Sequence, residues 1–221
     1  MADVSIRSEA VAQQIRAIER VARATPRPSP ALERLGAAMR RLSRWTLTVD
    51  DEASIEHAAG CLDGLIEELE IADRGATTRF ATPLDRDPDE RLVNAQGRHP
   101  LLGSTHPIAP HIELRVEGDR TVGDVTFDIR FEGNEGWVHG GFVAAGFDIV
   151  AVQAARLSGR SGPTGTLTVR FIAPTPIGEP LRYEGRFVRS EGRKLFSEGR
   201  LIRLDDGSVT AEASAIVVAF D

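Results

Sequence analysis

The second half of this chain carries six extended runs but only one helical run. The first two runs, at residues 112–116 and 122–131, alternate apolar and polar positions on either side of a turn. A helix is expected at about residues 140–157, and four more extended runs follow near residues 164–173, 180–191, 193–204 and 208–220. Parallel strands would each need a crossover helix, so this order excludes a doubly wound sheet. It predicts an α+β domain with a six-stranded, mainly antiparallel sheet.

The single helix is apolar around nearly its whole circumference. Asp148 is the only formal charge in residues 141–155. Such a helix needs burial on most of its sides, which a sheet curled around it supplies. The run Trp137–Ala155 also has about the length of a membrane span, but His139, Asp148 and Gln153 would be costly in lipid. We therefore predict a central helix buried inside the sheet of a soluble protein.

Amphipathic helical patterns fill the first third of the chain. Apolar residues recur at three- and four-residue spacing in residues 11–22, 31–45 and 51–71. The pattern then gives way to a segment rich in Pro, Gly, Asp and Arg. We predict three parts: a helical N-terminal extension at residues 1–75, an irregular connection at residues 76–110, and the sheet domain at residues 111–221.

Composition and charge exclude several functions. The chain has 27 Lys and Arg against 33 Asp and Glu, and the resulting net charge of −6 disfavours nucleic-acid binding. Cys61 is the only cysteine, so no intramolecular disulfide can form and a reducing compartment fits best. The N-terminal residues mix charges and lack the apolar segment of a secretory signal. We expect a cytoplasmic protein that binds neither nucleic acid nor membrane.

Three histidines lie in or beside the connection: His99, His106 and His111. They could form a metal set, but no acidic or cysteine ligand stands at a matching spacing. Loop histidines without a ligand role are the favoured interpretation, and no metal or other cofactor is expected.

Candidate chemistry gathers at the central helix. A carboxylate such as Asp148 in apolar surroundings is unfavourable unless it is hydrogen-bonded or lines a cavity, so it is a candidate general base. The alternative is a carboxylate on the one wet stripe of the helix. The run His139-Gly140-Gly141 directly precedes the helix, where free N–H groups suit an oxygen that becomes negative, although a tight turn would need the same glycines.

Geometry separates these two groups within one chain. Eight residues of helix hold Gly140 and Asp148 about 12 Å apart, too far to act on the same carbonyl. A symmetric dimer with antiparallel helices would place Asp148 of one protomer opposite Gly140 of its partner, which gives two equivalent composite sites.

The HGG turn followed by Asp nine residues after the His resembles the signature of the PaaI-like group of hotdog-fold thioesterases. Two further segments look like the strands of that family: GPTGTLTVRFIAPTPIGEPL at residues 162–181 and LDDGSVTAEASAIVV at residues 204–218. The turn RSEGRK at residues 189–194 fits between them. The resemblance covers about residues 110–221 and implies a hotdog fold, in which the sheet wraps around the central helix.

The resemblance also implies an activity and a site. The activity would be hydrolysis of an acyl-CoA or acyl-carrier-protein thioester, without a cofactor, in a homodimer or a dimer of dimers. Asp148 would act as general base or nucleophile, and the Gly140 N–H would polarise the carbonyl. Thr164 would hold the attacking water, and His139 would support the loop or the carbonyl site.

Four residue sets are weaker candidates for contact with substrate. Many members of the family have Asn six residues before the His. This chain has Gly133 there, and Asn134, one position later, is the candidate. Gly141, the last residue of the HGG turn, is a further candidate. Arg189, Arg193 and Lys194 could bind the phosphates of coenzyme A, although a solvated hairpin tip is an equal alternative. The acyl tunnel could be shaped by Phe142, Phe147, Ile172 and Trp137, unless these are core residues.

Two other functions stay open. Hydration of enoyl thioesters on this fold uses a His a few residues after the Asp, and no His follows Asp148. A hotdog domain that binds an acyl-CoA or another apolar ligand without catalysis, as a sensor or interaction module, is the non-enzymatic alternative. The N-terminal helices could form a dimerisation layer, a lid over the acyl channel or a partner-docking arm.

Overall fold

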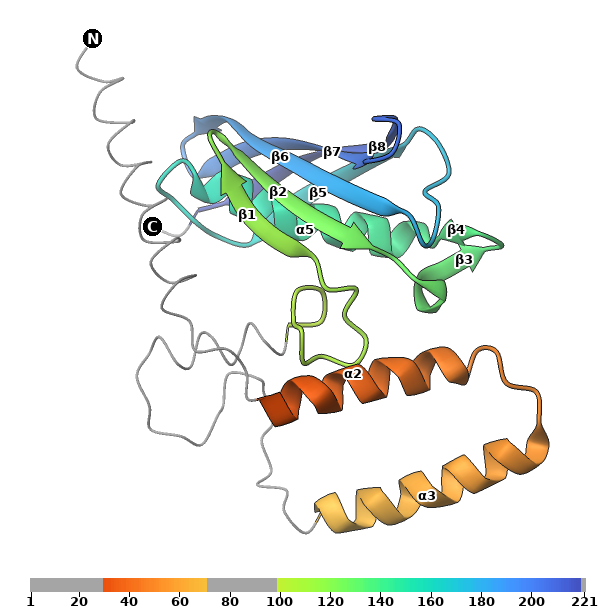
Figure 1. Ribbon diagram of the computed structural model, residues 1–221. Helices are drawn as coiled ribbons and strands as arrows, with labels where there is room; N and C mark the ends of the chain where they lie inside the picture. The colour runs from red at the N-terminus through yellow and green to blue at the C-terminus, as the bar shows by residue number, and fades with distance from the viewer. Residues whose placement is uncertain (1–29, 71–98, 220–221) are drawn as a thin grey trace. The chain divides into compact units, whose positions relative to one another are not determined.

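The chain is described by a computed structural model that covers residues 30–70 and 99–219 (Figure 1). The helix predicted at residues 11–22 and the part of the connection at residues 76–98 lie outside the described residues. The described residues divide into two compact units, residues 30–70 with 99–109 and residues 110–219.

The second unit is a six-stranded sheet with one long helix. Its strands are β1 (Glu113–Glu117), β2 (Arg120–Thr126), β5 (Thr164–Phe171), β6 (Pro180–Glu191), β7 (Lys194–Arg203) and β8 (Val209–Val218). The strand order is β1-β2-β6-β7-β8-β5, and every neighbouring pair is antiparallel. Helix α5 (Gly140–Arg156) runs along one face of this sheet (Figure 1). The predicted hotdog fold, with its sheet around a central helix, is confirmed.

Helix α5 packs mainly on β6 and β7. Val143, Phe147 and Val150 are each 1% exposed and form the centre of the core. Tyr183 of β6 reaches the helix, where its hydroxyl donates to the Val143 carbonyl at 3.1 Å and its ring meets Phe147 edge-on. A Cβ at Gly146 would lie 2.3 Å from the Tyr183 ring, so a glycine is required there. This packing fixes the helix that carries the candidate residues.

Strand β2 ends earlier than its alternating pattern predicts. The alternation continues to residue 131, but the strand stops at Thr126 and the 3-10 helix η1 (Ile129–Phe131) follows. The Asp128 side chain caps η1 by accepting from the Arg130 N–H. Phe127 and Phe131 are still both buried, with ring centroids 5.5 Å apart. The periodicity therefore reports burial on both sides of a bend rather than a continuous strand.

A small hairpin that the sequence did not reveal connects η1 to α5. Its strands are β3 (Glu132–Asn134) and β4 (Trp137–Val138), which form a separate two-stranded sheet. Gly136 adopts a φ of 78° at its turn, and the Gly136 N–H donates to the Glu132 side chain at 2.6 Å. The hairpin leads directly into the HGG turn.

The first unit contains α2 (Pro30–Trp45) and α3 (Glu52–Glu70), close to the predicted helices. One face of α2 holds the turns of residues 99–109: Gly36 packs on the Thr105 backbone, and Arg40 Nη1 donates to the Ser104 carbonyl at 2.7 Å.

His99 and His106 each accept a backbone N–H at Nδ1. The described residues contain no group of three or more metal-binding side chains. None of the described helices has the length and apolar character needed to span a bilayer.

Asp124 joins three strands at one edge of the sheet. It accepts from Arg115 Nη1 of β1 at 2.6 Å and from Arg182 Nε of β6 at 2.7 Å. Burial alone would raise the pKa of Asp124, but the hydrogen bonds from Arg182 and Arg115 outweigh it and lower the pKa below its usual value. The carboxylate therefore stabilises the fold above an unfolded-state pKa of about 3.9, and this contribution is lost as the pH falls through the lower folded-state pKa.

We expect Asp124→Asn to lower the free energy of unfolding at pH 7 by about 1 kcal/mol. The difference from wild type should shrink as the pH falls below about 4, because both chains then carry a neutral side chain at this position. Urea unfolding followed by circular dichroism between pH 7 and pH 3 measures both effects. Asp119→Asn is the matched control, since that side chain is 93% exposed and lies 3.9 Å from Arg120. Equal destabilisation at every pH would contradict the ionic explanation.

Candidate functional site

Hydrogen bonds fix the start of α5 from three sides. The Val138 N–H donates to the Thr175 carbonyl and the His139 N–H donates to the Phe131 carbonyl, each at 2.8 Å. His139 is the N-cap of α5, and its Nδ1 accepts from the Gly141 N–H at 3.0 Å. The His139 carbonyl accepts from the Phe142 N–H at 2.9 Å. His139 thus holds the loop, one of the two roles expected for it.

This arrangement leaves one N–H group available at the helix start. Of the N–H groups of residues 139–142, only that of Gly140 has no acceptor among the described residues. Such groups carry the positive end of the helix dipole. Gly140 therefore presents a fixed hydrogen-bond donor, whereas the Gly141 N–H is already used by His139.

Two close contacts explain the glycines around this donor. A Cβ at Gly133 would lie 2.8 Å from the His139 Cα, so the position at which many relatives have Asn is closed to a side chain here. A Cβ at Gly140 would lie 3.1 Å from the Phe171 ring. Phe171 thus covers the turn from the end of β5.

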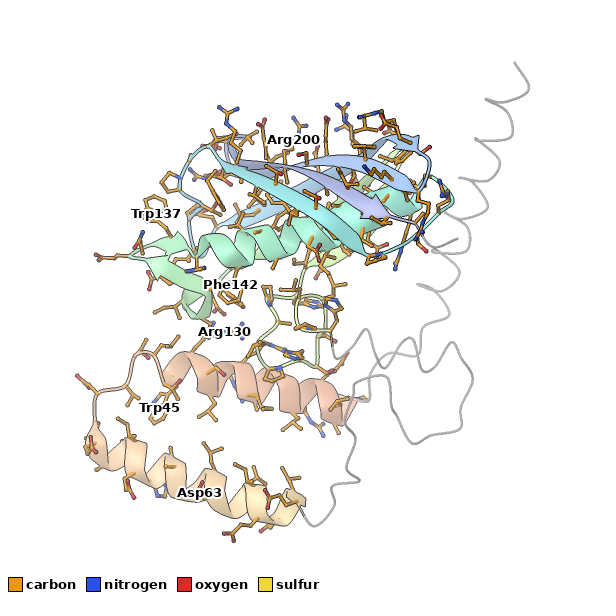
Figure 2. All side chains as sticks on the ribbon, turned by 180° about the vertical axis from the view of Figure 1, so that it is seen from behind. Trp45, Asp63, Arg130, Trp137, Phe142 and Arg200 are labelled. Carbon is orange, nitrogen blue, oxygen red and sulfur yellow. The ribbon has the colours of Figure 1, made fainter. Side chains whose placement is uncertain are left out.

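An open groove of ≈ 420 Å³ lies at this turn. It is lined by Asn134, Trp137, Val138, Gly140, Val143, Phe171, Ile172, Ala173, Pro174 and Thr175. The side chains of Trp137 and Phe171 are 43% and 55% exposed, so both offer apolar surface beside the Gly140 donor. Trp137 projects from the β3–β4 hairpin in Figure 2. The structure brings Gly140 and Asn134 together in one groove.

Asp148 lies outside this groove. It is half-buried on α5, two helical turns beyond Gly140, and its carboxylate has no hydrogen bond or ion pair within the described part of the chain. It interrupts a half-buried stripe of small and apolar residues on the helix: Ala144, Ala145, Ile149 and Val152. One chain alone therefore does not bring the donor and the carboxylate together.

Thr164 is the first residue of β5, the strand at one edge of the sheet. Its hydroxyl is buried and has no hydrogen-bond partner. A buried hydroxyl without a partner is unfavourable, so a water or substrate atom at this position would stabilise it. Thr164 lines neither the groove nor any other cavity described here.

The sequence of residues 135–210 matches the thioesterase superfamily, in a region that contains Gly140, Asp148 and Thr164. This match covers about a third of the chain. A crystal structure of the thioesterase superfamily protein RHA08564 is 28% identical, with a TM-score of 0.73 over 87% of this chain and 97% of that protein. Because 87% is more than the sheet domain alone, the similarity extends into the N-terminal half.

Two other solved structures are similar to this chain at lower identity. The E. coli PaaI protein from the phenylacetic acid degradation operon is 13% identical, with a TM-score of 0.47 over 51% of this chain and 81% of that protein. The protein smu.793 from Streptococcus mutans UA159, solved with acetyl CoA bound, is 14% identical, with a TM-score of 0.46 over 49% of this chain and 88% of that protein. No curated protein matches the chain.

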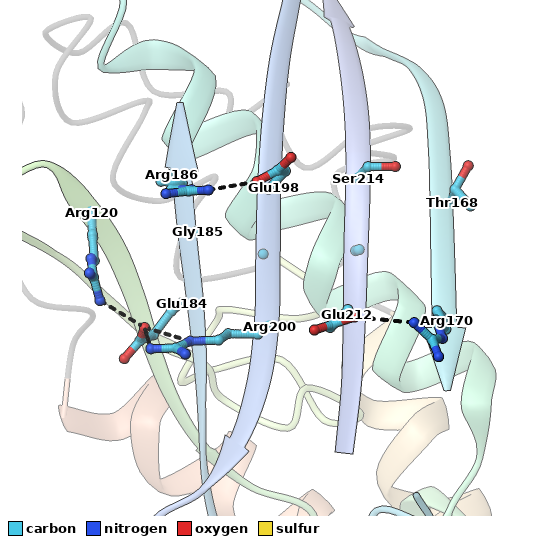
Figure 3. A pocket seen from close by; sticks show the side chains of 12 residues that line it. Arg120, Thr168, Arg170, Glu184, Gly185, Arg186, Glu198, Arg200, Glu212 and Ser214 are labelled. Atoms are coloured by element: carbon cyan, nitrogen blue, oxygen red, sulfur yellow. Dashed lines mark hydrogen bonds and ion pairs between the residues drawn. The ribbon is translucent and has the colours of Figure 1, made fainter. Parts of the chain in front are cut away.

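A second hollow, larger than the groove, lies on the outer face of the sheet (Figure 3). It has a volume of ≈ 560 Å³ and contains none of the predicted site residues. Its charged side chains neutralise one another across the strands, as Glu184 does with Arg200 at 2.9 Å and Arg120 at 3.2 Å. Figure 3 shows a second such pair, Arg186 with Glu198. We interpret this surface as a solvated face with cross-strand ion pairs.

The predicted phosphate patch lies on the β6–β7 hairpin. Arg189 is held by Glu191 at 2.9 Å and stacks over the Phe196 ring at 3.9 Å. Arg193 Nε donates to the Ala219 carbonyl at 3.0 Å. Lys194 is exposed and has no ion pair in the described part of the chain. These contacts give both arginines structural roles on the hairpin and leave Lys194 accessible.

Of the four residues suggested for an acyl tunnel, two line the groove and two do not. Trp137 and Ile172 line it, whereas Phe147 is fully buried against Tyr183. Phe142 packs edge-on to Phe131, with ring centroids 5.0 Å apart. The sequence analysis did not predict Phe171 as a groove residue, although Phe171 lies within the segment 162–181 that resembles the family.

Proposed function

We propose that the protein hydrolyses the thioester of an acyl-CoA or acyl-carrier protein at composite sites in a homodimer. The match of residues 135–210 to the thioesterase superfamily supports thioester hydrolysis as the general activity. The observation that carries the proposal is the Gly140 N–H, the one N–H at the start of α5 without an acceptor among the described residues. A preorganised donor of this kind stabilises the oxyanion of a tetrahedral intermediate.

A two-fold dimer could bring the Gly140 N–H and the Asp148 carboxylate together, which one chain alone does not. Strand β5 lies at an edge of the sheet, contains no proline and ends beside the groove at Phe171. An unpaired edge of this kind is a template for pairing with a second copy. The half-buried stripe of α5 around Asp148 would then face the same stripe of the partner, which brings Asp148 opposite the partner subunit's Gly140.

The proposed reaction needs only water and these groups. Asp148 takes a proton from a water molecule, whose oxygen attacks the thioester carbonyl carbon while the Gly140 N–H holds the oxyanion. The tetrahedral intermediate then collapses, the C–S bond breaks, and the proton passes from Asp148 to the departing thiolate. The products are the free acid and the thiol. Asp148 as a nucleophile that forms an acyl-enzyme anhydride is the alternative use of the same carboxylate.

The remaining candidates take supporting roles in this proposal. The unpartnered Thr164 hydroxyl holds the attacking water, and Trp137 and Phe171 cover the apolar part of the substrate beside Asn134. Lys194 meets the phosphates of coenzyme A at the β6–β7 hairpin. The single cysteine favours a reducing cytoplasmic setting for this activity.

The test is a thiol-release assay over short, medium and aromatic acyl-CoAs and the matching acyl-carrier proteins. Cys61 is exposed and would react with a thiol reagent, so Cys61→Ser is used as the parent chain. Turnover that saturates with one class of thioester supports the proposal. Binding of acyl-CoA by calorimetry without release of thiol would contradict it and favour the non-catalytic sensor.

A further inference from the structure

Helix α3 is fully formed but uncovered. It contains 19 residues, none of them is buried, and no other described helix or strand makes more than a marginal contact with it. Its interior contains Gly60 and Gly64, whose neighbourhood is empty and which disfavour a helix by about 1 kcal/mol each relative to Ala. Most helical stability in proteins comes from packing of an apolar face rather than from helix propensity. We therefore expect α3 to have a partner beyond the described helices and strands of its own chain.

Both helices of the first unit present an apolar stripe. On α3 it consists of Ile55, Ala58, Ala59, Leu62, Leu65, Ile66 and Leu69, with Ile66 and Leu69 50% and 54% exposed. On α2 it contains Leu35 and Met39, which are 46% and 41% exposed. The stripe of α2 differs from its Gly36–Arg40 face, which already holds the turns of residues 99–109.

The two helices have opposite charge. Helix α3 carries six acidic residues and no Lys or Arg, whereas α2 carries four arginines and one glutamate. Two copies of α3 would repel each other, and so would two copies of α2. Because both helices carry an apolar stripe and their charges are opposite, α2 is a suitable packing partner for α3.

The two helices do not pack closely on each other in the described structure, although only residues 46–51 separate them. The turns after α2 are hydrogen-bonded, with the Thr46 and Val49 N–H groups donating to Leu42 and Trp45 at 3.0 Å. Asp51 then caps α3 by accepting from the Ser54 N–H at 2.9 Å. With this ordered link in place, no described helix or strand covers either stripe.

We propose that α2 of one chain packs on α3 of a second copy, and that the reciprocal contact forms a four-helix layer about the two-fold axis. A single two-fold operation covers both α3 helices at once and pairs each acidic helix with a basic one. This inference concerns assembly and does not depend on the proposed hydrolysis. It assigns the helical extension to dimerisation rather than to a lid.

Charged residues beside each stripe allow a direct test. Arg34 and Arg41 lie two helical turns apart beside the α2 stripe, and Glu56 and Asp63 lie two turns apart beside the α3 stripe. All four are exposed, and Figure 2 shows Asp63 on α3. Arg34→Glu with Arg41→Glu, and Glu56→Arg with Asp63→Arg, therefore reverse the charge on one helix at a time.

The readout uses Cys61, the only cysteine, which is exposed on α3 beside the stripe, on the flank opposite Glu56 and Asp63. A nitroxide on Cys61 of the full-length wild type is expected to give a narrow inter-chain distance on the order of 20 to 30 Å by pulsed electron resonance. Each double reversal alone should lose this peak, because α2 and α3 then carry the same sign. Glu67→Arg is the control: of the acidic residues of α3 it lies farthest around the helix from the stripe, it makes half the change of charge of the double reversal, and it should keep the peak.

Mixed dimers decide between contacts across chains and contacts within one. The two reversed chains are co-expressed with different affinity tags, and the species that carries both tags is isolated. If α2 contacts the partner's α3, one contact is wild type and the other is reversed on both sides, so the narrow distance returns. A peak that stays absent in the mixed dimer, or that is absent in wild type, would overturn the proposal. Thiol release by the wild type is measured separately, because the proposed hydrolysis can hold or fail independently of this contact.

Discussion

Asp148→Asn is expected to lower kcat for thioester hydrolysis by about 100-fold or more, the scale of general-base catalysis. Asparagine has nearly the same shape but cannot take the proton of water or attack the carbonyl, so the change removes both roles considered for the carboxylate. Asp148 has no hydrogen bond or ion pair within the described part of the chain, and its replacement therefore breaks no contact that holds the fold. Substrate binding and the melting temperature should stay close to wild type.

The measurement is kcat and KM by thiol release at saturating substrate, with the melting temperature of the same preparations. Asp119→Asn is again the matched control, because it makes the same change of charge at an exposed turn far along the chain from α5. Its kcat should equal that of wild type. An Asp148→Asn chain that keeps a third or more of the activity would remove this carboxylate from the mechanism.

The fold follows from the sequence where burial is one-sided or complete. The apolar run of α5 and the alternation of β1 and β2 predict their elements to within a few residues, because both patterns report the side that faces the core. At Phe127 and Phe131 the same alternation was misleading, since a 3-10 turn between two buried aromatics gives the spacing of a strand. The hydrophobic pattern shows only which residues are buried. It does not show the local hydrogen bond from the Arg130 N–H to the Asp128 side chain, which caps the 3-10 helix where the chain bends.

The candidate site was predictable in its parts and not in its arrangement. The HGG turn and Asp148 lie within ten residues of each other, so these residues and their spacing could be recognised in the sequence. The ring of Phe171 over Gly140 joins residues 31 positions apart, and the closing of Gly133 by His139 depends on the β3–β4 hairpin. Contacts of this kind arise from tertiary packing, which a linear pattern does not encode. For the same reason the sequence did not predict that Arg189 contacts Glu191 and that Arg193 contacts Ala219 on the β6–β7 hairpin.

Gly140→Pro is expected to lower kcat by about 100-fold or more, because proline removes the single N–H proposed to hold the oxyanion. Proline is well tolerated at the first position of a helix, and His139, with φ −59° and ψ 127°, already has the conformation favoured before proline. The helix should therefore form as before. Gly140→Ala is the control: it keeps the N–H, adds a Cβ 3.1 Å from the Phe171 ring, and measures the steric part of the effect. Equal losses in both variants would assign the effect to the Phe171 contact.

Combining the two variants tests whether the site is shared between chains. In a mixed dimer, one chain carries Asp148→Asn with an intact Gly140, and the other carries Gly140→Pro with an intact Asp148. If each site takes its carboxylate from one chain and its N–H from the other, one of the two sites is fully wild type, and about half of the wild-type activity returns. If both groups act within one chain, every site is damaged and the mixed dimer is as inactive as its parents. Recovery in the mixed dimer therefore distinguishes a site shared between two chains from a site in which Gly140 and Asp148 of the same chain, about 12 Å apart at about 1.5 Å per residue, act on one substrate.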